Sequence, residues 1–196
     1  MYSPFESGMK SGSARVYEHQ IPGGQYSNLL VQCQSMGIYD KWEDVLIAYR
    51  DVNDLFGDIV KVTPSSKCVG DLALYLVTRN LSTADLVKGN AKIDFPESVV
   101  GLFKGELGLP HRGFPKGIES VILKGSEKLK DRPGLLLQPV DFDENIKTLT
   151  ARFNQSITPE QAMSYLMYPK VFSDYLTKQQ RTRFDHSLPH LLMMKI

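Results

Sequence analysis

Cysteine and net charge are both scarce in this sequence. Its 196 residues contain two cysteines, Cys33 and Cys68, which form no C-x-x-C pair and fall on apolar faces of expected helices. We interpret them as buried free thiols in a reducing compartment, with a disulfide as the alternative. Twenty-three basic and twenty-two acidic residues leave a formal charge of +1. A nucleic-acid groove or an anionic membrane surface needs clustered positive charge, so we expect neither.

Long hydrophobic runs are absent as well. The longest aliphatic run, Leu135–Leu137, is far below the length of about 20 residues that a membrane span needs. The first residues, Met1–Ser7, show no basic start followed by an apolar run, so we expect no secretory signal peptide. Hydrophobic residues still make up 42% of the chain, which is enough to bury a core and favours a single domain.

Most of the apolar residues that are present recur at the spacing of an α-helix. Helical patterns cover about 24–36, 40–56, 65–80, 82–89, 95–107, 115–124 and 143–153, and a last one runs from 158 onward with a break at Pro169. Residues 59–62 and 135–142 are expected to be extended, and 14–20 is a candidate extended piece. The predicted fold class is therefore mainly α, with about nine helices and one or two short strands.

Several polar residues and glycines mark the expected helix ends. Asp40 and Thr158 are expected N-caps, and Ser82–Asp85 has the spacing of a capping box. Gly37 is expected just past the end of one helix and Gly108 at the end of another, because glycine tolerates the left-handed conformation found there.

The stretch Lys61–Ala73 joins a proline bend, hydroxyl groups and two amines to the start of an apolar helix. Pro64 disfavours helical angles in Thr63, so we expect Thr63 on an extended bend. A serine of the pair 65–66 is the expected N-cap of the helix. The free N–H groups there, with Lys67 beside them, favour a carboxylate or a polarised carbonyl oxygen. An ordinary helix cap that binds nothing is the alternative.

Three separated motifs resemble one known family. They are Ile21–Asn28, Lys61–Ala73 and Phe95–Val100, in this order. Together they are similar to the region that follows the barrel in the carboxyltransferase domain of the pyruvate carboxylase family, to which oxaloacetate decarboxylase alpha and transcarboxylase subunits are related. The likeness runs from about Tyr17 to about Tyr175.

The resemblance implies a domain organisation. Residues 1–24 would be the linker from the barrel exit, residues 25–176 the helical post-barrel domain, and residues 177–196 a divergent or truncated tail. The TIM barrel itself has no counterpart in this sequence. We therefore expect the chain to begin where a barrel has just ended, and to be inactive without that barrel.

The resemblance also implies a function and site residues. The chain would form the carboxybiotin-facing half of a site that transfers a carboxyl group to pyruvate and yields oxaloacetate. Thr63 matches the threonine that relays a proton between pyruvate and biotin. Ser66 and Lys67 match positions that hydrogen-bond the biotin ureido group, and Gln25 lies in a turn near the mouth of the site. For Tyr26, a partly buried aromatic role is favoured over a ligand contact.

The implied cofactor is biotin, carried on a separate carrier domain, and the family's divalent metal belongs to the missing barrel. The implied partners are the TIM-barrel part of the carboxyltransferase, the biotin carboxyl carrier domain and further copies in a homo-oligomer, with no nucleic acid and no membrane. The implied setting is gluconeogenesis in the cytoplasm, or in the mitochondrial matrix of a eukaryote. The alternative function is a stand-alone helical module that binds biotin or other subunits and has no activity of its own.

The sequence departs from the family pattern in two places. The family has two glycines where this chain has Arg112 and Gly113, and a left-handed φ at the first position would strain Arg112. The likeness fades after Tyr175. In the tail, His186 and His190 are four residues apart, but a proline lies between them and no further ligand completes a set, so we expect no metal site.

Overall fold

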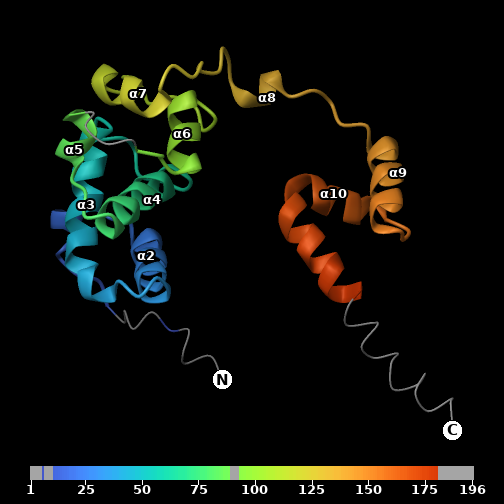
Figure 1. The fold of residues 1–196 in the computed structure, drawn as a ribbon, viewed down its shortest axis with the longest axis horizontal. Coiled ribbons are helices and arrows are strands. Elements are labelled where there is room, and N and C mark those ends of the chain that lie inside the picture. Colours follow the sequence, from blue (N-terminus) through green and yellow to red (C-terminus); the bar gives the residue numbers. More distant parts are fainter. Residues whose placement is uncertain (1–5, 7–10, 89–92, 181–196) are drawn as a thin grey trace, which may run out of the picture. The chain divides into compact units, whose positions relative to one another are not determined.

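The computed structural model describes residues 6, 11–88 and 93–180, which form helices joined by loops (Figure 1). The helices are α1 (Val16–His19), α2 (Gly23–Ser35), the 3₁₀ helix η2 (Tyr39–Lys41), α3 (Trp42–Leu55), α4 (Ser65–Thr78), α5 (Thr83–Lys88), α6 (Glu97–Lys104), α7 (Lys116–Leu123), α8 (Pro133–Leu136), α9 (Phe142–Phe153), α10 (Pro159–Met167) and a last helix over 169–180. In this part of the chain the only β feature is an isolated bridge between Glu106 and Gly108. The predicted mainly α fold class without a barrel is confirmed.

The chain divides into two compact units, residues 1–137 and residues 138–196, each of which we describe by itself. We call them the N-terminal unit and the C-terminal unit. Among residues 11–88 and 93–180, no helix combines the length and the apolar character needed to cross a bilayer. The domain limits expected from the sequence, at residues 24 and 176, stay predictions.

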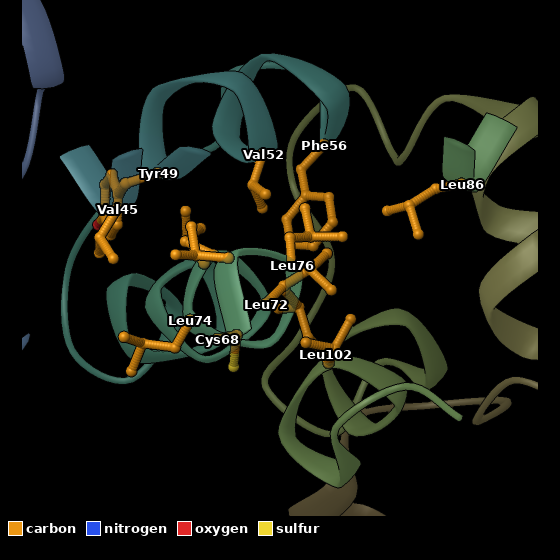
Figure 2. Packing of buried hydrophobic residues seen from close by; sticks show 14 of the residues in the cluster. Val45, Tyr49, Val52, Phe56, Cys68, Leu72, Leu74, Leu76, Leu86 and Leu102 are labelled. Atoms are coloured by element: carbon orange, nitrogen blue, oxygen red, sulfur yellow. The ribbon is translucent and has the colours of Figure 1, made fainter. Parts of the chain in front are cut away.

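The core of the N-terminal unit is centred on α4, which packs against α2, α3 and α6. On α3, apolar side chains three or four residues apart form one stripe and face α4 (Figure 2). The buried residues of this contact are Val45, Tyr49, Val52 and Phe56 on the α3 side and Leu72 and Leu76 on the α4 side. Burial of one such side chain contributes about 1.5–3 kcal/mol, so the pairing of α3 with α4 anchors the unit.

An aromatic stack extends this core beyond α4. Phe103 of α6 contacts Phe56 edge-on, with ring centroids 4.9 Å apart, and stacks on Phe114, with ring centroids 4.0 Å apart. The stack joins the end of α3 to α6 and to the loop before α7. It therefore fixes the position of α6 relative to α3 and α4.

The two cysteines are free and buried, as the sequence predicts. Burial raises the pKa of both thiols, and the nearby Asp71 carboxylate raises that of Cys68 further. Both are therefore core residues rather than reactive thiols.

The C-terminal unit has its own small core, in which α9, α10 and the helix over 169–180 meet. Its buried residues are Leu149, Ile157, Ala162, Phe172 and Leu176. The expected cap at Thr158 is confirmed as a full capping box with Gln161. The expected break is also confirmed, because α10 ends at Met167 and a new helix begins at Pro169.

Three local predictions are wrong. Residues 14–20 contain the short helix α1 instead of an extended piece, and the expected extended segment 135–142 begins with the end of α8 and ends in α9. No strand forms at 59–62. Helices of four residues show no repeat in the sequence, which is why α1 and α8 were not predicted.

Two helix ends also differ from prediction. Asp40 lies inside η2 rather than capping α3, whose N-cap is Lys41. Helix α6 ends at Lys104 because Gly105, with φ of +94°, takes the left-handed position that the sequence assigned to Gly108. The capping box of Ser82 and Asp85 is confirmed, since each backbone N–H is bonded to the other side chain.

The concern about Arg112 is also resolved by the backbone. The left-handed residue in this loop is Gly113, with φ of +69°, whereas Arg112 is not among the non-glycine residues with positive φ. Arg112 therefore fits the loop without backbone strain.

Candidate functional site

The loop between α3 and α4 is held at its start by polar contacts that involve the buried side chain of Asn53. Asn53 of α3 is fully buried and donates from Nδ2 to Oδ1 of Asp58 at 2.7 Å, while its carbonyl accepts from the Asp58 N–H at 2.9 Å. Nζ of Lys61 donates to Oε1 of Gln20 at 3.0 Å and lies 3.4 Å from the same Asp58 oxygen. The loop thus leaves α3 in a defined direction.

Thr63 lies on the bend at the end of this loop, and its side chain is exposed. Pro64 follows it through a cis peptide bond and occupies the N-cap position of α4. Neither Ser65 nor Ser66 is the N-cap, so this prediction is wrong. Ser65 is already the first helical residue, and its hydroxyl reaches back to the backbone of Val62 instead of forward to a helix N–H.

Ser66 is almost completely buried, with 2% of its surface exposed. Its carbonyl accepts a hydrogen bond of 3.4 Å from the Tyr49 hydroxyl, and burial raises the pKa of that hydroxyl, which keeps it protonated.

Lys67 points away from the core and is paired with Asp71 one turn further along α4. Its Nζ lies 2.5 Å from Oδ2 of Asp71, and the side chains are 55% and 19% exposed, respectively. The same oxygen accepts a hydrogen bond of 2.6 Å from Oγ of Ser98 on α6. An ammonium has three donors, so Lys67 can donate to a ligand while it stays paired with Asp71.

Gln25 is buried at the contact between α2 and α4. A methyl group at Gly70 of α4 would lie 2.7 Å from Nε2 of Gln25 and 3.0 Å from Cδ2 of Leu29. The absent side chain at Gly70 therefore leaves room for the Gln25 amide. Because Gly70 follows Ser66 by four residues, Gln25 lies along the face of α4 that carries Ser66.

We expect Gly70→Ala to destabilise the N-terminal unit by about 1–3 kcal/mol, because the new methyl group displaces Gln25 and Leu29 in a packed contact. The measurement is urea-induced unfolding of the 196-residue chain. Gly101→Ala on α6 is the matched control. The three atoms nearest to its methyl group would all belong to the Glu106 carboxylate, and Glu106 is exposed and can move, so we expect no loss of stability. Equal losses for the two variants would contradict this reading of Gly70.

The three sequence motifs meet around α4. Motif 21–28 supplies Gln25, which contacts the helix at Gly70, and motif 95–100 supplies Ser98, which bonds Asp71. Motif 61–73 is the bend and the first half of α4 itself. The role of Asp71 was not predicted from the sequence, although its position four residues after Lys67 is the spacing of a helical ion pair.

A groove of about 650 Å³ lies between residues 57–65 and residues 107–113. Val62, Pro64 and Ser65 line it on one side, and Leu109 and Arg112 line it on the other. The groove thus borders the loop that carries Thr63. Among the described residues, no group of three or more His, Cys, Asp or Glu side chains is placed to hold a metal ion. The tail histidines lie outside the described residues.

Comparison with known proteins identifies the family. The family model described as a conserved carboxylase domain matches residues 16–195, and 175 residues are 53% identical to the pyruvate carboxylase of Bacillus subtilis. The chain belongs to the pyruvate carboxylase family. The pyruvate carboxylase of Staphylococcus aureus is 50% identical over 185 residues. These matches cover 89% and 94% of this chain but only 15% and 16% of the respective relatives.

Solved structures of pyruvate carboxylase share the fold. The carboxyl transferase domain of the Rhizobium etli enzyme, solved with pyruvate and biocytin, is 44% identical with a TM-score of 0.82, and the match covers 91% of this chain and 30% of that domain. The complete multifunctional Rhizobium etli enzyme is 45% identical with a TM-score of 0.78, over 89% of this chain and 16% of that one. The family match reaches residue 195, so the likeness continues past Tyr175, where the motifs alone indicated that it fades.

Proposed function

We propose that this chain forms the carboxybiotin-facing part of a pyruvate carboxylase site that transfers a carboxyl group to pyruvate and yields oxaloacetate. The observation that carries the proposal is the convergence of the three family motifs on the start of α4, where the Thr63 hydroxyl and the Lys67 ammonium are exposed. The Rhizobium etli neighbour solved with pyruvate and biocytin supports the ligand classes.

The exposed hydroxyl of Thr63 and the exposed ammonium of Lys67 are chemically suited to a biotin ureido group. Carboxybiotin, when bound, supplies the carbon dioxide that forms the new bond. Thr63 accepts the proton that leaves the pyruvate methyl group and donates its own proton toward the ureido nitrogen, because a hydroxyl is donor and acceptor at once. In carboxybiotin the bond between the ureido nitrogen and the carboxyl carbon would break, leaving its electron pair on the nitrogen that takes the Thr63 proton. The C–H bond of the pyruvate methyl group breaks, and its electron pair forms the bond to the released carbon. No charge remains on Thr63 after both transfers.

Lys67 is proposed to donate to the ureido carbonyl oxygen, where an ammonium stabilises charge that develops as the carboxyl group leaves. Its ion pair with Asp71 limits the motion of the side chain, and its exposure leaves donors free for the ligand. Ser66, with 2% of its surface exposed, lies on the buried side of α4, so the proposed contact with the ureido group is assigned to Lys67, and Gln25 packs along the Ser66 face from α2. The barrel with its divalent metal and the biotin carrier domain complete the site in this proposal.

We expect Lys67→Gln in a complete pyruvate carboxylase carrying this sequence to raise the KM for free biotin about 10- to 100-fold, which corresponds to one hydrogen bond from a charged donor. The measurement is carboxyl transfer from oxaloacetate to free biotin. Lys128→Gln is the matched control, because Lys128 is also ion-paired, with Glu119 at 3.0 Å, but lies after α7 and away from motif 61–73. An unchanged KM for biotin in Lys67→Gln would remove Lys67 from the biotin site.

A further inference from the structure

The segment that leads to Thr63 is buried at Ile59, which has 6% of its surface exposed, and becomes exposed toward Thr63. Residues 59–62 form neither helix nor strand. The side chains of Val60 and Val62 are 79% and 62% exposed, so burial of these side chains does not fix the segment. A proton relay nevertheless requires its hydroxyl at a defined position, because displacement by about 1 Å can cost about 100-fold in rate.

One hydroxyl bonds three backbone groups of this segment. Oγ of Ser65 lies 2.6 Å from the carbonyl oxygen of Val60 and 2.6 Å from that of Val62, and it accepts a hydrogen bond of 3.2 Å from the Val62 N–H. A hydroxyl has one proton, so it donates to one carbonyl at a time while it accepts from the N–H. Ser65 itself is anchored as the first residue of the 14-residue helix α4.

These bonds act on the peptide groups next to Thr63. The carbonyl of Val62 belongs to the same planar peptide group as the N–H of Thr63, and the N–H of Val62 belongs to the preceding one. Holding both groups fixes the two peptide planes on either side of Val62. The direction in which the chain enters Thr63 is then set from α4.

We propose that Ser65 is a positioning residue for Thr63. The Ser65 hydroxyl holds the bend through its backbone hydrogen bonds and thereby fixes the position of the Thr63 hydroxyl; this inference rests on the proposed function. The other end of the loop is held independently by Asn53, Asp58 and Lys61. Removal of the Ser65 hydroxyl leaves the Val62 carbonyl its bond of 3.1 Å from the Ser66 N–H, but it removes the bonds to the Val60 carbonyl and the Val62 N–H. The bend is therefore loosened locally, and the loop stays connected to the core. Ser65 is distinct from Lys67, since it acts through the backbone and not on the ligand.

The test uses a complete pyruvate carboxylase carrying this sequence. Ser65→Ala is expected to lower kcat of carboxyl transfer to pyruvate about 100-fold, with the KM for pyruvate changed less than about threefold. The ATP-dependent carboxylation of biotin keeps its rate. Ser65→Thr keeps the hydroxyl and should recover most of kcat. Ser120→Ala on α7 is the control, because that hydroxyl also bonds a backbone carbonyl, of Gly117 at 2.9 Å, but outside the loop.

A double variant separates a positioning role from a structural one. If Ser65 acts through Thr63, then Ser65→Ala added to Thr63→Ala causes no further loss, because interacting residues are not additive. The inference on Ser65 is overturned if Ser65→Ala keeps native kcat while Thr63→Ala does not, or if its effect multiplies with that of Thr63→Ala. If Thr63→Ala itself keeps native kcat, the proposed function fails first and the inference with it.

Discussion

Thr63→Ala in a complete pyruvate carboxylase carrying this sequence is expected to lower carboxyl transfer to pyruvate about 10²- to 10⁴-fold, the range that a positioned acid–base group contributes. The ATP-dependent carboxylation of biotin should keep its native rate, because the chain contributes no proposed group to that step. The measurement compares oxaloacetate formation with bicarbonate-dependent ATP cleavage in the same preparation. In this variant, oxaloacetate formation is expected to fall while bicarbonate-dependent ATP cleavage keeps its native rate.

The control for this substitution is Thr148→Ala. Thr148 is also exposed, but it lies on α9 in the C-terminal unit, outside the three motifs. It should keep both rates. If Thr63→Ala retained oxaloacetate formation at the native rate, the exposed threonine would be no more than a part of the bend.

Phe103→Ala is expected to lower the free energy of unfolding of the 196-residue chain by about 3–5 kcal/mol, the usual loss for a buried phenylalanine. Phe103 is completely buried, and its ring makes an edge contact with Phe56 and a stacked contact with Phe114. Alanine would leave a cavity between α6, the end of α3 and the loop before α7. The measurement is the midpoint of urea-induced unfolding at an unchanged slope.

Tyr17→Ala is the control for the aromatic core, because Tyr17 is 87% exposed in the same unit. Its effect should stay within about 0.5 kcal/mol. A small effect of Phe103→Ala would mean that α6 is held without the stack.

Much of the fold was predictable because long helices repeat their buried faces. Leu29 and Cys33 of α2, and Leu72 and Leu76 of α4, are four residues apart in the sequence, and all are buried in the core. The short helices α1 and α8 could not be predicted in this way. Their four residues make one turn, so no second turn exists to show a period.

Caps depend on local backbone geometry that propensity alone does not determine. Thr158 is followed by a proline at the first helical position and by Gln161 at the third, and both are typical of a helix start. Its capping box is confirmed. Ser65 follows a proline that already occupies the N-cap position, so its hydroxyl was free to bond the preceding loop. The sequence pattern Pro-Ser-Ser is compatible with both outcomes.

The site could be predicted as a set of motifs but not as an arrangement. Lys67 and Asp71 are one helical turn apart, so their pairing follows from the sequence. The contacts of Ser98 with Asp71 and of Gln25 with Gly70 join segments 27 and 45 residues apart, and they depend on how α2 and α6 pack against α4. The resemblance to the family indicated the three motifs, and the packing of α2 and α6 against α4 explains why they lie close together in the structure.

The most direct test of the account asks whether the hydroxyl of Thr63 or only its shape is needed. Thr63→Val keeps nearly the same shape without the hydroxyl, whereas Thr63→Ser keeps the hydroxyl without the methyl group. The measurement is the single-turnover rate of carboxyl transfer from oxaloacetate to free biotin in the complete enzyme. We predict that the serine variant stays within about tenfold of the native rate and that the valine variant falls at least about 100-fold. Equal rates for the two variants would contradict the proton relay.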